Sequence, residues 1–333
     1  MQIVAIGDTH FKVDNMNIVD KLIEEIVSKL TILKPDLIVL LGDILHDHER
    51  LHTLALNRAL DFINKLRNIS KVFVLVGNHD MINHDQFLSD QHWMNALKHW
   101  DNVCIVDKVE HLECSDINAN FLFCPYVAPG RFQEALETHE FDWKESDIIF
   151  AHQEFKGCKM GAIISDDGDE WDIDDPFVIS GHIHSKQSPQ DNIMYPGSSM
   201  QVAYGESNEN IILIVDYNDG EIELTEQILN IPRKRIVYID TGSFDQYEPP
   251  ATEDEIKITI KGKYTDFKAI KKTSKYKKLV KLGFKISYKH EKLDITTDKK
   301  KAEVKDFTNV LESLVKSSSD EFLNKAYDKL LNK

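Results

Sequence analysis

The segment Lys71–Asp80, KVFVLVGNHD, constrains the fold of this chain more than any other. Its apolar run Val72–Val76 predicts a fully buried strand, and Gly77 ends that run abruptly. An amide, an imidazole and a carboxylate follow at once. A buried strand that presents such side chains at its carboxyl end has the composition of an active-site rim in an α/β protein.

Four further apolar runs end in the same way. They are Gln2–Ile6 before Asp8 and His10, Leu37–Leu41 before Asp43, Asp147–Ala151 before His152, and Phe177–Ser180 before His182 and His184. Taken singly, each of these polar residues is more often a turn residue or a hydrogen-bonded histidine than a ligand. Together with Asn78 they supply seven oxygen and imidazole donors after five strands. This concentration favours a metal centre.

The types of donor indicate which metal such a centre would hold. Carboxylate, amide and imidazole ligands without a thiolate favour a pair of first-row divalent cations over Ca²⁺. Two such cations carry four positive charges, of which the carboxylates Asp8 and Asp43 neutralise two. The remaining charge suits the binding of a phosphodiester and the activation of a bridging water. We expect Mn²⁺, with Mg²⁺ and Fe²⁺ as alternatives.

Predicted helices alternate with these strands. Apolar residues recur at helical spacing over Ile18–Leu33, near Leu51–Leu66 and over Gln86–Trp100. Uniformly apolar strands that alternate with helices predict an α/β fold with a parallel sheet covered on both faces. Further strands are predicted to complete a first domain over residues 1–243, at Val103–Val106, Asn120–Cys124, Ile211–Val215, Glu221–Leu224 and Arg235–Asp240.

Length and composition fit a cytoplasmic protein with more than one domain. The 333 residues allow one large core and a smaller module. No apolar run reaches the roughly 18 residues of a membrane span, and the first residues, MQIVAIGDTH, lack the basic region of a signal peptide. The four cysteines contain no CxxC pair, so we expect free thiols in a reducing cytoplasm.

Charge is distributed unevenly along the chain. The net charge of −16 argues against a protein that coats DNA over its whole surface. Residues 257–301 nevertheless hold 16 lysines against four acidic residues, which gives this segment a charge of +12 and leaves −28 for the remainder. The segment is therefore either a solvated lysine-rich face or a surface that binds a polyanion.

A small basic domain is predicted at residues 252–296. The Gly and Pro content of Thr241–Asp254 is typical of a linker. A strand at Glu255–Ile260, a helix at Tyr264–Val280 and a strand at Phe284–Tyr288 then predict a βαβ unit. We expect this unit to contact DNA backbone phosphates, through Lys271, Lys272, Lys275, Lys277 and Lys278.

Two amphipathic helices are predicted in the last segment, residues 302–333. Their apolar faces consist of Phe307, Val310, Leu311 and Leu314 in the first, and Leu323, Ala326, Tyr327 and Leu330 in the second. Ser318 and Glu321 have the spacing of a capping box for the second helix. Because helices this short are marginal alone, they either fold back on the first domain or bind a partner's helices.

The motifs GDTH, GD, GNHD, AH and GHIH, in this order, resemble those of the calcineurin-like metallophosphoesterases over Met1–Asp216. The resemblance implies a four-layer α/β/β/α sandwich. It implies a first metal bound by Asp8, His10 and His184, a second bound by Asn78, His152 and His182, and Asp43 as a bridge between them. His79 matches a histidine that contacts the substrate phosphate and helps to protonate the leaving oxygen.

Within that family, three features resemble the SbcD-type nucleases that process DNA ends. His46 in GDILH stands where those nucleases place a histidine associated with exonuclease activity, and Tyr195–Glu206 resembles their PGS loop. The order of the domains also matches, and the length resembles compact phage-encoded members. The resemblance implies a Mn²⁺-dependent exonuclease and endonuclease in DNA repair and recombination, in host cytoplasm if phage-encoded. It also implies a homodimer within a heterotetramer, whose carboxyl-terminal helices bind the coiled coil of an SbcC-like ATPase.

Two other functions stay open on the sequence. One is a stand-alone metallophosphoesterase that acts on a nucleotide, a small phosphodiester or a phosphoprotein. The other is a structural subunit whose metal site is vestigial, against which the full set of candidate ligands argues.

Overall fold

The computed structural model describes residues 1–48, 50–83, 85–290, 311, 314–318, 322–325 and 327. The chain divides into two compact units, Met1–Lys289 and His290–Lys333. Among the described residues, no helix has the length and apolar content needed to cross a membrane.

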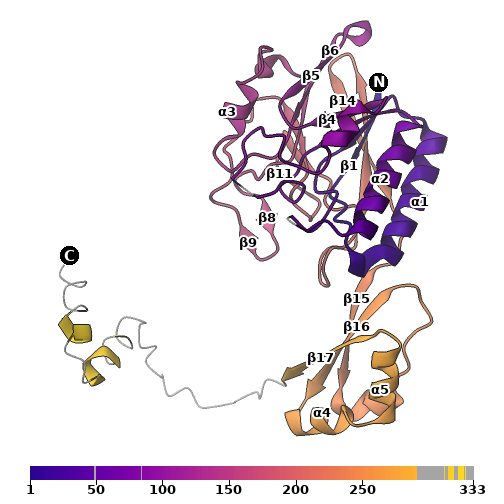
Figure 1. Ribbon diagram of the computed structural model, residues 1–333, viewed down its shortest axis with the longest axis vertical. Helices are drawn as coiled ribbons and strands as arrows, with labels where there is room; N and C mark the ends of the chain where they lie inside the picture. The colour runs from indigo at the N-terminus through magenta and orange to yellow at the C-terminus, as the bar shows by residue number, and fades with distance from the viewer. Residues whose placement is uncertain are drawn as a thin grey trace. The chain divides into compact units, whose positions relative to one another are not determined.

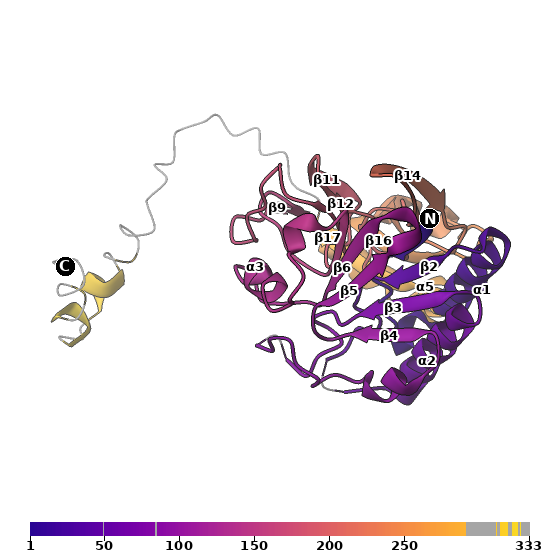
Figure 2. The same cartoon turned by 90° about the horizontal axis from the view of Figure 1, so that it is seen from above.

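The first sheet is built around the amino-terminal strand (Figure 1). Its order is β14-β13-β1-β2-β3-β4, in which β1 to β4 run parallel and β13 is antiparallel to both β1 and β14. The strands are β1 (Gln2–Ile6), β2 (Leu37–Leu40), β3 (Lys71–Leu75), β4 (Val103–Val106), β13 (Ile211–Asn218) and β14 (Glu221–Ile228). Helices α1 (Met16–Leu33) and α2 (Thr53–Arg67) flank this sheet (Figure 2), and alternate strand residues such as Val4 and Ile38 pack with their apolar faces.

The second sheet has the order β11-β12-β10-β7-β6-β5, with β6, β7, β10 and β12 parallel. Its strands are β5 (Glu110–Cys114), β6 (Ala119–Cys124), β7 (Ile148–Ala151), β10 (Phe177–Ser180), β11 (Gln187–Gln190) and β12 (Ile193–Tyr195). The short helix α3 (Phe132–Leu136) packs on one face together with Trp143 and Trp171. A separate two-stranded hairpin, β8 (Lys159–Met160) and β9 (Ile163–Ile164), follows β7.

The main core lies between the two sheets. Ile3 and Ala5 of β1 alternate with the residues that face the helices, and they share one buried cluster with Phe121, Phe150 and Ile179 of the second sheet. Two sheets packed face to face, with helices on their outer faces, form the α/β/β/α sandwich. The predicted fold class is confirmed.

A third sheet, β15-β16-β17, forms the basic module. Strand β15 (Lys234–Asp240) pairs in parallel with β16 (Glu255–Gly262), and β17 (Lys285–His290) follows at the other edge of β16. The placement of Arg235–Asp240 in the first domain was therefore wrong. Val237 and Ile239 of this strand pack in the core of the module itself.

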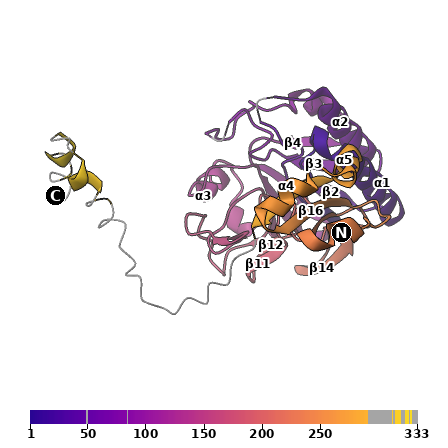
Figure 3. The same ribbon diagram turned by 90° about the horizontal axis from the view of Figure 1, so that it is seen from below.

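The helix predicted at Tyr264–Val280 is interrupted, giving α4 (Tyr264–Ile270) and α5 (Ser274–Lys281). The break is at Thr273, whose hydroxyl accepts a hydrogen bond from the Tyr276 amide at 3.2 Å and caps α5. Apolar residues of both helices share a cluster with Ile256, Ile258 and Ile260, so the helices lie along one side of β16 (Figure 3). The predicted linker contains a short 3-10 helix, η5 (Thr241–Gln246).

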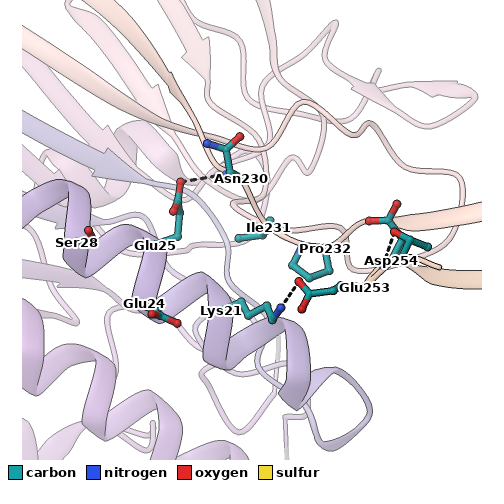
Figure 4. Close-up of a pocket in the computed structure, with 10 residues that line it drawn as sticks. Lys21, Glu24, Glu25, Ser28, Asn230, Ile231, Pro232, Glu253 and Asp254 are labelled. Carbon is teal, nitrogen blue, oxygen red and sulfur yellow. Dashed lines mark hydrogen bonds and ion pairs between the residues drawn. The ribbon is translucent and has the colours of Figure 1, made fainter.

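Polar contacts join this module to α1 (Figure 4). Lys21 of α1 pairs with Glu253, and Glu25 accepts a hydrogen bond from the Asn230 amide at 3.1 Å. These residues line a cleft of about 560 Å³ whose rim also holds Glu24. Four of its ten lining residues are acidic, against one lysine, so the cleft repels anions.

The prediction of a helix at Gln86–Trp100 was wrong for most of that segment. Only a 3-10 helix, η2 (Asn95–His99), forms there. The residues before it make tertiary hydrogen bonds, because His92 binds Asp107 at 3.0 Å and the Trp93 indole donates to another carboxylate. Other 3-10 helices are η1 (Val13–Asn15), η3 (Ser115–Ile117) and η4 (Trp143–Glu145).

The predicted tail helices are described only in part. Residues 314–317 and 322–325 are helical. Of the predicted apolar faces, Leu311, Leu314 and Leu323 are exposed and Tyr327 is half-buried, whereas Phe307, Val310, Ala326, Leu330 and the capping residue Glu321 lie outside the described residues.

Candidate metal centre

The seven predicted ligands meet where β1, β2, β3, β7 and β10 end. Parallel strands in each sheet bring their carboxyl ends to one edge, so residues far apart in the sequence become neighbours. Two groups of ligand atoms result, each with its atoms within 4.8 Å of one another. The first group comes from Asp8, His10 and His184, and the second from Asp43, His152 and His182.

In the first group, imidazole nitrogens face one another. The Nε2 atoms of His10 and His184 are 2.9 Å apart, and each lies 3.9 Å from Oδ2 of Asp8. That carboxylate oxygen is buried and has no hydrogen-bond partner among the described residues. Because His184 donates its Nδ1 proton to Glu206 at 3.1 Å, the neutral ring presents a lone pair at Nε2. A divalent cation satisfies this arrangement of donors.

The second group has the same character. His152 donates from Nδ1 to the Leu41 carbonyl at 2.6 Å, so its neutral form has a lone pair at Nε2. That nitrogen is 3.0 Å from Oδ1 of Asn78, which also lies 2.9 Å from Nδ1 of His182. An amide oxygen and an imidazole lone pair repel at this distance unless a proton or a cation lies between them. The Asn78 amide oxygen is therefore placed where the predicted second set of ligands would need it.

Asp43 lies between the two groups. Its Oδ2 atom is 3.4 Å from Nε2 of His152 and 3.7 Å from Nε2 of His10. The other oxygen accepts a hydrogen bond from the His79 amide at 2.8 Å, which fixes the orientation of the carboxylate. This is the position expected of a bridging ligand.

The buried carboxylates of the site need positive charge nearby to stay ionised. Burial alone raises the pKa of a carboxyl, as it does for Asp8. Burial also raises the pKa of Asp43, but the histidines around it, His152 together with His10 and His79, outweigh burial and hold the pKa well below its usual range. For His152, burial lowers the pKa and the Asp43 carboxylate raises it, and the resulting pKa is about 9. Two cations would supply the charge that protonated imidazoles supply without them.

Backbone conformation also marks the site. His10, Asp43 and His182 have positive φ values of 46°, 50° and 76°, a region that costs non-glycine residues roughly 1 kcal/mol or more each. Two glycines allow the close approach of the strand ends. A Cβ atom on Gly42 would lie 2.5 Å from Nδ1 of His152, and one on Gly77 would lie 2.3 Å from a carboxylate oxygen of Asp43.

His79 lies beside the ligands. Its Nδ1 donates to the His46 carbonyl at 2.6 Å, so its Nε2 is the nitrogen left for a substrate. The ring stacks on His48 with centroids 4.3 Å apart, and burial lowers the pKa of His79. His46 contacts the ring of His10, with their Nδ1 atoms 3.4 Å apart. Nitrogens of His10, His46 and His79 also lie within 4.8 Å of one another, a third group that the sequence did not indicate.

Two residues in the site had no role predicted from the sequence. Asp80 accepts hydrogen bonds from the amides of Gly77, Ile44 and Leu45 and from the indole of Trp93. It thereby joins the loops that follow β2 and β3. Glu206, known only as the end of the PGS-like loop, accepts from His184 and from the amides of residues 202 and 203 at 2.6 and 2.9 Å. Both residues are acidic and follow predicted strands or loops of the site, but their key partners Ile44, Leu45 and His184 are distant in sequence.

A cleft of about 690 Å³ opens beside the ligands His182 and His184. The hairpin β8–β9 contributes Lys159 and Met160 to it, and the PGS-like loop contributes Tyr204. A substrate that reaches the metal centre from this side meets one lysine and one aromatic ring.

Comparison with known proteins places the chain in a family. Residues 1–186 match the calcineurin-like phosphoesterases, and the chain belongs to this family. It is a metal-dependent phosphoesterase, and its two groups of Asp, His and Asn ligands fit the pair of metals that the family uses. Cations bound there would supply Lewis acidity and an activated water.

Two viral proteins are close relatives. The chain is 49% identical over 277 residues to "Putative phosphoesterase 244L" of Invertebrate iridescent virus 6, an alignment that covers 81% of this chain and 97% of the relative. It is 45% identical over 294 residues to "Putative phosphoesterase 078R" of Invertebrate iridescent virus 3, covering 87% and 84%. Among solved structures, a dimetal phosphatase from Danio rerio is similar at 11% identity and a TM-score of 0.41, over 68% of this chain and 96% of that one.

Proposed function

We propose that this chain is a Mn²⁺-dependent nuclease that hydrolyses phosphodiester bonds at DNA ends, an SbcD-type subunit acting in repair and recombination. The observation that carries this proposal is the junction between the metal centre and the basic module. The PGS-like loop, whose Glu206 accepts a hydrogen bond from His184, also contacts β15. The backbone amide of Lys234 donates to the Gln201 side chain at 2.7 Å, and its ammonium group donates to the Val202 carbonyl at 2.8 Å. A lysine-rich sheet thus begins where the catalytic cleft ends, which suits a long polyanionic substrate.

The proposed metal follows from the ligands. His10, His152, His182 and His184 provide imidazole nitrogens, which Mn²⁺ accepts more readily than Mg²⁺, an ion that prefers oxygen donors and water. Asp8, Asp43 and Asn78 provide oxygen ligands. His79 is the proposed general acid. Its backbone amide donates to Asp43 and its Nδ1 donates to the His46 carbonyl, so the protonated ring would present its Nε2 proton to the leaving oxygen.

The proposed partner is an SbcC-like ATPase that binds the tail helices, within a heterotetramer built on a homodimer of this chain. The described part of the tail supports this docking, since Phe322 is 81% exposed and Leu314 is 62% exposed. Apolar side chains spaced on a helix are the usual anchors for a partner helix.

A second candidate is a stand-alone phosphoesterase for a nucleotide, a small phosphodiester or a phosphoprotein. The names of the two viral relatives, both phosphoesterases, fit this broader activity. This function needs the metal centre but not the basic module.

The test compares substrates on the full-length chain with Mn²⁺, Mg²⁺ or EDTA. The nuclease proposal predicts Mn²⁺-dependent cleavage of linear and circular DNA that increases when the ATPase partner is added. Hydrolysis of bis-p-nitrophenyl phosphate or of nucleotides without DNA cleavage would support the second candidate instead. Comparable activity in Mg²⁺ alone would contradict the proposed metal.

A further inference from the structure

We propose that the face of the third sheet opposite α4 and α5 binds single-stranded polynucleotide and leads it to the metal centre. The inference rests on the proposed function and names the form of its substrate. It differs from the sequence prediction, which assigned DNA contacts to lysines that the structure places on and between the two helices.

The register of the strands defines this face. Residues 236, 238 and 240 of β15 lie opposite residues 257, 259 and 261 of β16, whereas the alternate residues Ile256, Ile258 and Ile260 pack with the helices. The hydroxyls of Thr259 and Ser287 are 3.0 Å apart, which places residues 285, 287 and 289 of β17 on the same face. Its lysines are Lys257, Lys261, Lys285 and Lys289. Tyr238 is 51% exposed, so solvent reaches this face.

At two places on this face, a tyrosine ring lies within 5.9 Å of one lysine of β16 and one lysine of β17; Tyr238 belongs to β15 and Tyr204 to the PGS-like loop. Lys261 and Lys289 lie 4.2 and 5.9 Å from the ring centroid of Tyr238. Lys257 and Lys285 lie 5.8 and 5.5 Å from that of Tyr204. Aromatic rings that stack on bases, interleaved with cations that contact phosphates, are the usual means of binding single strands without sequence preference. The two pairs of lysines are four positions apart along their strands, a distance of about 13 Å.

Tyr204 connects this face to the reaction centre. The same ring lines the 690 Å³ cleft beside His182 and His184. It also lines a second cleft with Lys285, on the side of the module where Asp14, Asp254 and Glu255 lie. Its hydroxyl lies 3.5 Å from Glu255 on β16. A strand held along the sheet therefore passes Tyr204 before a phosphodiester can reach the metal ligands.

The occupant follows from the chemistry of this face. An acidic protein would pair with the lysines but would not need exposed rings between them, and a duplex hides the faces of its bases from such rings. The acidic cleft between α1 and residues 252–254 (Figure 4) disfavours phosphates along that flank of the module. The combination of lysines and tyrosines selects unpaired nucleotides.

The test measures binding of a fluorescent thymidine oligonucleotide to the full-length chain in EDTA, over a series of salt concentrations. One variant changes Lys257, Lys261, Lys285 and Lys289 to Gln. The matched control changes Lys271, Lys272, Lys277 and Lys278 to Gln, which removes the same charge from the helix side. We expect the first variant to bind at least tenfold more weakly and to reduce the slope of log K against log[salt] by up to about 3. The control should keep both.

Tyrosine variants separate stacking from charge. Tyr238→Ala should weaken binding of the oligonucleotide by roughly five- to 150-fold, and Tyr238→Phe should restore it, because the phenyl ring still stacks. A loss in the helix-side control with none in the sheet variant would overturn the proposal. So would equal affinity for poly-glutamate, or for duplex of the same length. Because no metal is present, these results do not depend on nuclease activity, which is scored separately by DNA cleavage in Mn²⁺.

Discussion

Glu206 should hold one metal ligand in its binding orientation. One carboxylate oxygen accepts the Nδ1 proton of His184 at 3.1 Å, and the other accepts the amides of Val202 and Ala203. In Glu206→Gln, an NH₂ group replaces one of these acceptors, so either the imidazole or the two amides meet a donor. Loss of such an outer contact typically costs 10- to 100-fold in metal affinity.

The structure predicts that only one of two metals is affected. His184 belongs to the group with Asp8 and His10. The imidazoles of His152 and His182 instead make polar contacts with Leu41, Asn78 and Glu154. Titration of the metal-free chain with Mn²⁺, followed by electron paramagnetic resonance, should show one site weakened by 10- to 100-fold and the other unchanged. Excess Mn²⁺ should restore activity.

The matched control is Glu209→Gln, which removes the same charge three residues away. Glu209 is exposed, and its carboxylate pairs with Lys186 on the surface. The Glu209→Gln variant should leave the affinities of both metal sites within about twofold of the wild type. Equal weakening of both sites by Glu206→Gln, or no change in either, would refute the assigned role.

Three further predictions follow from particular residues. His79→Ala should retain both metals, measured by metal analysis, yet lose roughly 10²- to 10⁴-fold in rate, and loss of metal would show that His79 is a ligand. Asp80→Ala should lower the free energy of unfolding in urea by about 3 kcal/mol, because three backbone amides and an indole lose their acceptor. An unchanged urea midpoint would contradict that account. Truncation after Lys301 should leave a folded, Mn²⁺-dependent enzyme that no longer co-purifies with the ATPase. An unfolded product would show that the tail belongs to the core, and a retained partner would show that the tail is not the docking site.

Local sequence patterns were enough to predict the strand ends and the longest helix, because both depend on neighbouring residues. Apolar strands followed at once by polar residues indicated the strand ends, and parallel pairing brought Asp8, Asp43 and Asn78 to one edge without further information. The helix α1 was predicted nearly to its bounds because its apolar stripe is long and regular.

Long-range pairing could not be predicted in the same way. The alternating pattern of β15 fits an edge strand of either the first or the third sheet, and only its register with β16 decides between them. The segment before η2 has helical spacing, but the bonds of His92 and Trp93 to residues outside it override that preference. Asp80 joins its own loop to Ile44 and Leu45, and Glu206 joins its own loop to His184, so the roles of both depend on partners at least 22 residues away that their residue types did not indicate.

The central claim is that strand ends from two sheets build one centre for two metals, bridged by Asp43. Metal analysis after loading with Mn²⁺, combined with anomalous diffraction, tests it most directly. The wild-type chain should bind two ions, one near His10 and His184 and the other near Asn78, His152 and His182. Asp43→Ala should lose the paired site and the hydrolysis of phosphodiesters together. A single ion, ions bound elsewhere, or an active Asp43→Ala enzyme would contradict the account.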